Sequence, residues 1–399
     1  MTGTFGVLPY GRQTIDDDDV AAVTAALRDD FLTTGPKVAE FEAAFSGATG
    51  AAHAVACNNG TAALHLAALA LGLGPDDAAI VPSLTFLATA NIVRMTGAEV
   101  VFCDVDPDTG LLTPETLARA IEGATSYKLK LRAALPVHLN GQICDMEGIA
   151  TIARKNGLSL IEDACHALGV EAIGACRHSA AACFSMHPVK AITTAEGGVV
   201  TTPDADMARR MRRLRSHGML RDSGEFQNDR LAFDGSAANP WYYEMHEIGW
   251  NYRLPDLLCA LGISQLRKLP AFFTRRKAIA AYYDRVLASL APLVRPVPHV
   301  GRAHGWHIYA LLVDFSALGT TRAGFMGMLR EKGCGSQVHY IPVHQQPYYQ
   351  NRYGSRSLPG TVSYYERCLS IPIYPALTDS DVSRVADAVT NCVLQCSRG

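Results

Sequence analysis

The sequence predicts an α/β protein built on a mostly parallel sheet. Between about residues 50 and 202, short and nearly continuous apolar runs alternate with segments of helical pattern. Strands that helices cover on both faces have this pattern, because neither of their faces meets water. The length of 399 residues suggests two or three domains, or one large core with an appendage, and with 48% apolar and 19% charged residues the chain can bury a sizeable core.

Seven runs have the length and apolar content of buried strands. They are 52–57, 78–82, 99–105, 132–139, 158–163, 181–186 and 198–202. The intervals between them contain helical patterns that begin near Thr61, Phe86, Thr113 and Met146. We therefore predict a seven-stranded sheet flanked by helices.

The pattern changes after residue 202. A basic segment at 207–218 is predicted as a helix with a solvated face rather than a nucleic-acid patch, and a Gly/Asn/Asp-rich loop follows at 222–240. A long helix is predicted from Pro255 to about Leu290, and a proline-rich hinge at 291–300. Beyond the hinge, strands are predicted at 307–315 and 336–343, and helices at 321–332 and 378–395. The prediction is thus a large domain over 1–290 and a smaller C-terminal α/β domain over 291–399.

The charge balance excludes some classes of function. The chain has 36 Lys and Arg against 38 Asp and Glu, which gives no electrostatic basis for binding nucleic acid or a membrane surface. It has no apolar run of the roughly 18 residues that a membrane helix needs, and no signal-like start, so a cytoplasmic location is expected. Its eleven cysteines form no C-x-x-C pair, which disfavours a disulfide framework or a metal site.

Three segments carry residue types suited to chemistry. At 57–64 an apolar strand ends in an Asn-Gly turn and a helix begins near Thr61, which is a place where phosphate can bind, although a plain helix cap has the same pattern. At 158–166 a strand delivers Glu162 and Asp163 to its carboxyl end, where such sheets bind ligands, although an ordinary acidic loop also fits. At 184–198 Lys190 lies among apolar and small residues, where loss of solvation would favour its neutral, nucleophilic form, although a lone lysine is usually a solvated surface residue.

A phosphate site, a strand-end acid and a desolvated lysine are together what pyridoxal 5'-phosphate requires. The chain resembles the DegT/DnrJ/EryC1/StrS family in three respects. These are the order of the three segments along the chain, the segment Leu32-Thr33-Thr34-Gly35, and the pattern F-S-x-H-x-x-K followed by T-T-x-E-G-G. These are fold-type I aminotransferases that act on nucleotide-linked keto-sugars, and the resemblance covers essentially the whole chain. It implies pyridoxal 5'-phosphate as cofactor and no metal.

The resemblance also implies roles for individual residues. Lys190 would bind the cofactor aldehyde and later move a proton, Asp163 would pair with the pyridine nitrogen, His166 would lie near the ring's phenolic oxygen and Phe86 would stack on the ring. The phosphate would be held by Gly60, Thr61, Ala62 and Ser185, and by Asn251 of a partner subunit, which implies a homodimer. Three positions depart from the common pattern, where relatives often have Phe for Met186, a hydroxyl for Ala62 and Gln for His166.

Segments 215–220 and 337–343 look most like the transaminases of pseudaminic acid biosynthesis. Those enzymes aminate C4 of a UDP-linked 4-keto-6-deoxy-L-hexosamine with L-glutamate as donor, and this is the function that the resemblance implies. The implied sugar pocket comprises Tyr10, Leu32, Thr33, Thr34, Arg253, Gln337, Val338, His339 and Tyr340.

Other functions stay open at this point. One is formation of UDP-4-amino-4-deoxy-L-arabinose, since Trp306-His307 and Pro347-Tyr348-Tyr349 resemble features of that transaminase. A sulfur-transfer lyase would use the same lysine but needs a mobile cysteine in a glycine-rich loop, and none of the eleven stands in one. Related sugar dehydratases replace the lysine with His, so Lys190 disfavours that reaction.

Overall fold

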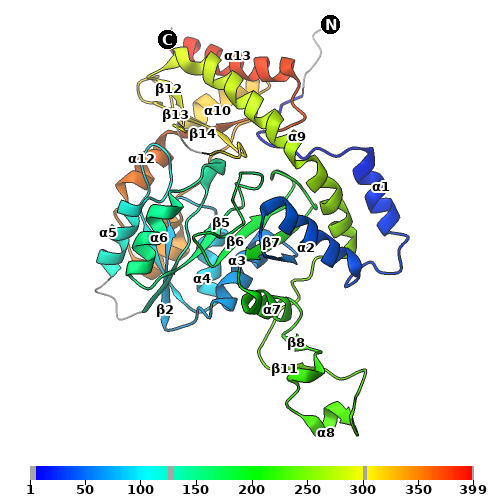
Figure 1. The fold of residues 1–399 in the computed structure, drawn as a ribbon. Helices are drawn as coiled ribbons and strands as arrows, with labels where there is room; N and C mark the ends of the chain where they lie inside the picture. The colour runs from blue at the N-terminus through cyan, green and yellow to red at the C-terminus, as the bar shows by residue number, and fades with distance from the viewer. Residues whose placement is uncertain (1–5, 125–129, 300–302, 398–399) are drawn as a thin grey trace.

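The computed structural model describes residues 6–124, 130–299 and 303–397. Position 300 of the expected hinge and the chain ends of the two expected domains lie outside these ranges. Figure 1 shows a large sheet with helices around it, a smaller sheet near both chain ends, and a segment that extends away from the body.

The central sheet has seven strands in the order β1-β7-β6-β5-β4-β2-β3. Their bounds are His53–Cys57 (β1), Asp77–Pro82 (β2), Glu99–Cys103 (β3), Lys130–Ala134 (β4), Ser159–Asp163 (β5), Ala181–Ser185 (β6) and Gly198–Thr202 (β7). Strand β7 pairs antiparallel with both of its neighbours, and the other pairs are parallel. The predicted fold class and all seven strands of this sheet are confirmed.

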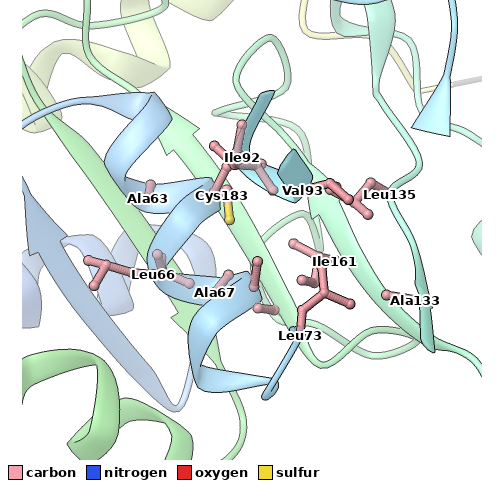
Figure 2. Close-up of a cluster of buried hydrophobic side chains, with 14 of the residues drawn as sticks. Ala63, Leu66, Ala67, Leu73, Ile92, Val93, Ala133, Leu135, Ile161 and Cys183 are labelled. Atoms are coloured by element: carbon pink, nitrogen blue, oxygen red, sulfur yellow. The ribbon is translucent and has the colours of Figure 1, made fainter. Parts of the chain in front are cut away.

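Helices cover both faces of this sheet. Helices α3 (Gly60–Ala70), α4 (Leu87–Met95) and α7 (Ala205–Leu214) pack on one face, where Ile161 and Cys183 of the strands meet Ala63 and Leu66 of α3 (Figure 2). The other face is covered by α5 (Pro114–Ala124) and α6 (Met146–Lys155) near β3 and β4, and by α2 (Pro36–Thr49) and α9 (Asp256–Leu287) near β6 and β7. The four predicted helix starts are each correct to within one residue.

Helix α9 runs from the large sheet to the small one (Figure 1). Helices α1 (Asp17–Ala26) and α2 pack against its first half, and α13 (Asp379–Cys396) packs against it as well. The predicted helix from Pro255 is confirmed, with the 3₁₀ turn η3 (Ala288–Leu290) at its end. Helices α1 and α2 were not predicted.

The small sheet has three antiparallel strands in the order β12-β13-β14. They are Val294–Pro296, Tyr309–Val313 and Cys368–Ile371, and α10 (Arg322–Glu331) and α13 share their apolar core. The strand predicted at 336–343 is wrong: Gln337 makes one isolated bridge to Ser370, and Val343–Gln345 is a 3₁₀ turn, η4. Two short helices before β14, α11 (Pro347–Tyr353) and α12 (Pro359–Arg367), were also not predicted.

The predicted helix 207–218 is wrong at its end. Helix α7 stops at Leu214, because His217 and Gly218 take left-handed φ angles of 64° and 71°. The segment after it is the one that extends from the body in Figure 1. It contains β8 (Met219–Leu220), η2 (Ser223–Glu225), α8 (Asp229–Ala232), β9 (Phe233–Asp234), β10 (Ala237–Ala238) and β11 (Glu244–Met245). The loop predicted at 222–240 is therefore partly regular.

Candidate active site

A cavity of about 660 Å³ lies where the carboxyl end of β5 meets the start of α3. Ligands bind at this edge of an open α/β sheet, because strand ends and helix starts converge there. The cavity brings together predicted residues that are far apart in the sequence. They are Tyr10, Gly60, Thr61, Ala62, Phe86, Asp163, His166, Ser185, Lys190, His339 and Tyr340.

Asp163 ends β5 and is held by hydrogen bonds from two directions. The hydroxyl of Thr89 donates to Asp163 Oδ2 at 2.7 Å, and the backbone amide of Cys165 donates to Oδ1 at 3.2 Å. Since Thr89 gives its proton to Asp163, its 2.8 Å contact with Thr85 Oγ1 is a bond in which Thr85 donates. This chain of donors keeps the Asp163 carboxyl in one orientation at the edge of the cavity.

Lys190 stands in the loop between β6 and β7. The loop is closed by backbone bonds from Met186 N to Gly197 O (2.9 Å) and from Thr194 N to Met186 O (3.0 Å). Burial lowers the pKa of Lys190 below its usual value, while Cys165 and Asp163 act in the opposite direction. The neutral amine, which is the nucleophilic form, is thereby favoured.

The start of α3 offers an anion site. Asn59 caps the helix, accepting from Ala62 N at 2.8 Å through its side chain and from Ala63 N at 3.1 Å through its carbonyl. Within the described ranges, the amides of Gly60 and Thr61 have no acceptor. A Cβ on Gly60 would lie 2.7 Å from Ser185 Cβ, so only glycine allows the helix start to approach β6 this closely. Two free amides, the Thr61 and Ser185 hydroxyls and the helix dipole together fit a phosphate.

His166 lies on the wall of the cavity between a backbone amide and a phenol. Asn140 N donates to His166 Nδ1 at 3.3 Å, and Tyr340 Oη lies 3.1 Å from Nε2. Its ring packs against His307, with 4.4 Å between the ring centroids. Burial, with smaller contributions from Lys190 and His339, lowers the pKa of His166 well below its usual value, so the imidazole is neutral.

Aromatic side chains form the mouth of the cavity. Phe86 precedes α4 and is 55% exposed, and its ring centroid lies 5.8 Å from that of Tyr340. Tyr10 packs against His339 at 5.1 Å, which joins the N-terminal segment to the loop before η4. An exposed phenyl face beside Lys190 and Asp163 is suited to stacking on a flat, heteroaromatic ligand.

The remaining predicted site residues lie outside this cavity. Thr34 and Arg253 line a second cavity of about 370 Å³, together with Glu42, Arg212 and Arg215. Neither cavity includes Leu32, Thr33, Asn251, Gln337 or Val338 among its lining residues. Leu32 is 51% exposed, and Asn251 is exposed beside its bridge partner Ser216. Gln337 is tied to β14, with its amide donating to Ser370 O at 3.1 Å.

The cavity also contains residues that the sequence analysis did not select. Tyr252, Glu196, His187 and Val189 line it, as does Cys165. Each of them lies next to a predicted residue or inside one of the motifs described above, so the motifs could have indicated them. Thr89 and Asn140 gave no such signal, because they meet Asp163 and His166 only through the fold.

Two further observations concern the whole described chain. Residues 6–124, 130–299 and 303–397 contain no group of three or more His, Cys, Asp or Glu side chains arranged to hold a metal ion. Over the same ranges, none of the helices combines the length and apolar content needed to cross a membrane.

Comparison with known proteins places this site in context. Residues 13–390 match the model of the DegT/DnrJ/EryC1/StrS aminotransferase family. The spore coat polysaccharide biosynthesis protein SpsC of Bacillus subtilis (strain 168) is 39% identical over 393 residues, which are 97% of this chain and 97% of SpsC. Helicobacter pylori PseC, an aminotransferase involved in the biosynthesis of pseudoaminic acid, superposes with a TM-score of 0.86 and 28% identity over 98% of this chain and 100% of PseC. Streptococcus pneumoniae Spr1654 in its PLP form gives a TM-score of 0.85 and 25% identity over 98% and 99%.

Proposed function

Since the chain belongs to the DegT/DnrJ/EryC1/StrS aminotransferase family, we propose that it moves an amino group from L-glutamate to C4 of a UDP-linked 4-keto-6-deoxy-L-hexosamine. The substrate is UDP-2-acetamido-2,6-dideoxy-β-L-arabino-hexos-4-ulose, and the product is a precursor of pseudaminic acid. The observation that carries the proposal is the single cavity that holds Lys190, Asp163 and the start of α3.

The enzyme is a sugar aminotransferase that depends on pyridoxal phosphate. The residues present fit this group, because the first-turn amides of α3 have no intrahelical acceptor and Gly60 lets this helix start lie close to Ser185. The phosphate would bind there, Asp163 would hold the pyridine nitrogen, and Lys190 would hold the aldehyde. When bound, pyridoxal phosphate supplies an electron-withdrawing ring that stabilises negative charge on the carbon being deprotonated.

Residues of the chain itself transfer the proton, hold the ring nitrogen and exclude water. The lowered pKa of Lys190 lets its amine accept a proton from a substrate carbon near neutral pH and return it to another carbon. Asp163, fixed by Thr89 and the Cys165 amide, would hold the ring nitrogen. Phe86 offers a flat apolar surface that excludes water from one face of the ring site.

The identity of the sugar is supported by the relative PseC, an aminotransferase involved in pseudoaminic acid biosynthesis. SpsC is more similar in sequence, and it is a protein of spore coat polysaccharide biosynthesis. The second candidate is therefore amination of another nucleotide-linked keto-sugar, such as the one that leads to 4-amino-4-deoxy-L-arabinose. Substrates of this kind differ by a few contacts at C5, C6 and the acetamido group, each worth about 1–3 kcal/mol.

The test is a reaction with purified enzyme, L-glutamate and each UDP-linked 4-keto-sugar in turn. We expect the 2-acetamido-6-deoxy sugar to give an amino-sugar and 2-oxoglutarate with the highest kcat/KM. A higher kcat/KM with another keto-sugar would replace the substrate and keep the reaction. Release of sulfide or alanine from cysteine without amino-sugar formation would replace the reaction itself.

The working unit in this proposal is a homodimer. Its support is the position of the predicted residues that lie outside the Lys190 cavity, since Asn251 is exposed and Thr34 and Arg253 line a separate cavity. Large apolar side chains are exposed in the segment that precedes Asn251, with Trp241 at 73% and Ile248 at 75%. In a dimer, this face of one subunit would complete the cavity of the other.

A further inference from the structure

A hydrogen-bonded series on the cavity wall fixes where the proton of Tyr340 lies. An amide N–H can only donate, so His166 Nδ1 is an acceptor in its 3.3 Å contact with Asn140 N. A neutral imidazole then carries its proton on Nε2, which lies 3.1 Å from Tyr340 Oη. Nε2–H therefore donates to the phenol oxygen, and the phenol O–H is left to donate elsewhere.

The amide that sets this tautomer is itself fixed. Asn140 has a left-handed φ of 62°, its side-chain Nδ2 donates to Tyr364 Oη at 2.9 Å, and its carbonyl accepts from Ile308 N at 3.2 Å. These partners come from segments far apart in the sequence and hold the turn from two sides. The ring of His166 also packs against that of His307, so His166 has little room to rotate.

Tyr340 contacts both His166 and Phe86 at the wall of the cavity. Its ring is stacked on that of His166 with an interplanar angle of 29°, and the ring of Phe86 lies on another side. Both Tyr340 and His166 line the cavity that holds Lys190. A phenol oxygen that accepts a hydrogen bond becomes a stronger donor through its own proton, because the two bonds polarise each other.

We propose that Tyr340 is a further catalytic residue, whose O–H donates to the keto oxygen of the bound sugar, and that His166 is the positioning residue that orients it. A ketone oxygen has only lone pairs, so a site for it needs a donor. The inference rests on the proposed function, because it assumes a keto-sugar as acceptor. It assigns no bond-making step to Tyr340, only a hydrogen bond that polarises the carbonyl.

The test separates the two halves of the reaction in Tyr340→Phe. We expect the half-reaction with the keto-sugar to slow by about 100-fold, and by at least ten times more than the half-reaction with L-glutamate. Both are followed through the absorbance of the bound cofactor. Tyr282→Phe, which removes the hydroxyl of a tyrosine of α9 outside the cavity, is the matched control and should retain wild-type rates. A keto-sugar rate within twofold of wild type in Tyr340→Phe overturns the inference.

The positioning role of His166 has its own readouts. Nitrogen-15 NMR of cofactor-free enzyme should show His166 with a bare Nδ1 and a protonated Nε2, and a proton on Nδ1 would contradict the inference. His166→Leu should slow the keto-sugar half-reaction. The double variant with Tyr340→Phe should be only slightly slower than His166→Leu alone, because the two residues act as one unit. His166→Gln, which retains a donor, should recover part of the rate. Additive losses in the double variant would show independent roles and refute the coupling.

Failure of this inference is distinguishable from failure of the proposed function. If wild-type enzyme aminates no UDP-linked 4-keto-sugar, the proposed function is wrong, whatever the Tyr340 variants do. If wild-type enzyme aminates one and Tyr340→Phe does so equally well, only the role of Tyr340 is wrong.

Discussion

A single amine, that of Lys190, distinguishes this cavity from an ordinary phosphate site. Lys190→Ala removes the group expected to hold the cofactor and move the proton. We expect kcat to fall by about 1000-fold or more, and the absorbance of the bound cofactor at about 420 nm to disappear. Absorption spectra measure the loss of the bound-cofactor band, and single-turnover experiments measure the fall in rate. An unchanged spectrum with full activity would show that another residue holds the cofactor.

Asp163 provides the second prediction at this scale. Asp163→Asn keeps the shape of the side chain but removes the negative charge that Thr89 and the Cys165 amide hold in place. We expect the cofactor to remain bound and kcat to fall by about 100-fold, because an unprotonated ring nitrogen is a poorer electron sink. Cofactor titration and steady-state rates separate the two effects. Wild-type kcat in this variant would exclude Asp163 from the role.

Individual site residues were predictable when they stood in a continuous motif. Asp163 and Lys190 follow recognisable strand ends, and their chemistry is readable from neighbouring residues. Thr89 and Asn140 were not predictable, because their bonds to Asp163 and His166 join segments that are 74 and 26 residues away. Sequence neighbours say nothing about such contacts, which exist only once the sheet has formed.

At the scale of elements, the approach of α3 to β6 depends on one missing side chain. A Cβ at Gly60 would lie 2.7 Å from Ser185 Cβ, so Gly60→Ala must move the helix start or the strand. We expect cofactor affinity to fall by about 10- to 100-fold, which equilibrium titration measures. Gly47→Ala in α2 is the matched control, because a Cβ at Gly47 would have no atom within 4 Å. Equal affinity in the two variants would contradict the close-approach explanation.

Glu99 joins β3 to α4 and α11 and makes this connection sensitive to acid. Hydrogen bonds from Arg352 and Tyr353, together with the charge of Arg94, lower its pKa from 4.5 to about 2 against the effect of burial. The unfolded chain binds the proton more readily, so the stabilisation is complete above 4.5 and is lost as pH falls through about 2.

The corresponding variant is Glu99→Gln. We expect it to unfold about 1–2 kcal/mol more easily at neutral pH, with a gap that narrows as pH falls below 4.5. Urea unfolding at several pH values measures this, with Glu147→Gln on exposed α6 surface as control. A gap that stays constant with pH would show that the loss comes from packing rather than charge.

The elements of the large sheet were predictable because each strand is a compact apolar run. The small sheet was harder. Residues 336–343 include residue types common in strands, yet the consecutive residues His339 and Tyr340 both line the cavity. Neighbouring residues of a strand would point to opposite faces, so the segment does not continue as a strand beyond its single bridge at Gln337. The true third strand, β14, is only four residues long, which is too short for periodicity to reveal.

At the scale of the whole molecule, the proposed dimer predicts complementation between two inactive variants. Lys190→Ala lacks the lysine, and Asn251→Ala lacks the side chain expected to serve the partner. Refolded together in equal amounts, half of the dimers would be hybrids with one intact cavity each, which gives about a quarter of wild-type activity. Activity that stays at the level of the separate variants would place Asn251 in its own subunit's cavity or outside any site.

The loop at 336–343 has a consequence for how this scaffold could diversify. It contributes His339 and Tyr340 to the cavity but belongs to neither sheet, apart from the single bridge at Gln337. Lys190 and Asp163, by contrast, are carried by segments that adjoin strands of the large core. New acceptor specificities should therefore be accessible by replacing residues of this loop other than Tyr340. A library that keeps Tyr340 and varies the other seven positions of the loop, selected on an unrelated keto-sugar, should yield folded and cofactor-loaded variants far more often than one spread over the strand ends.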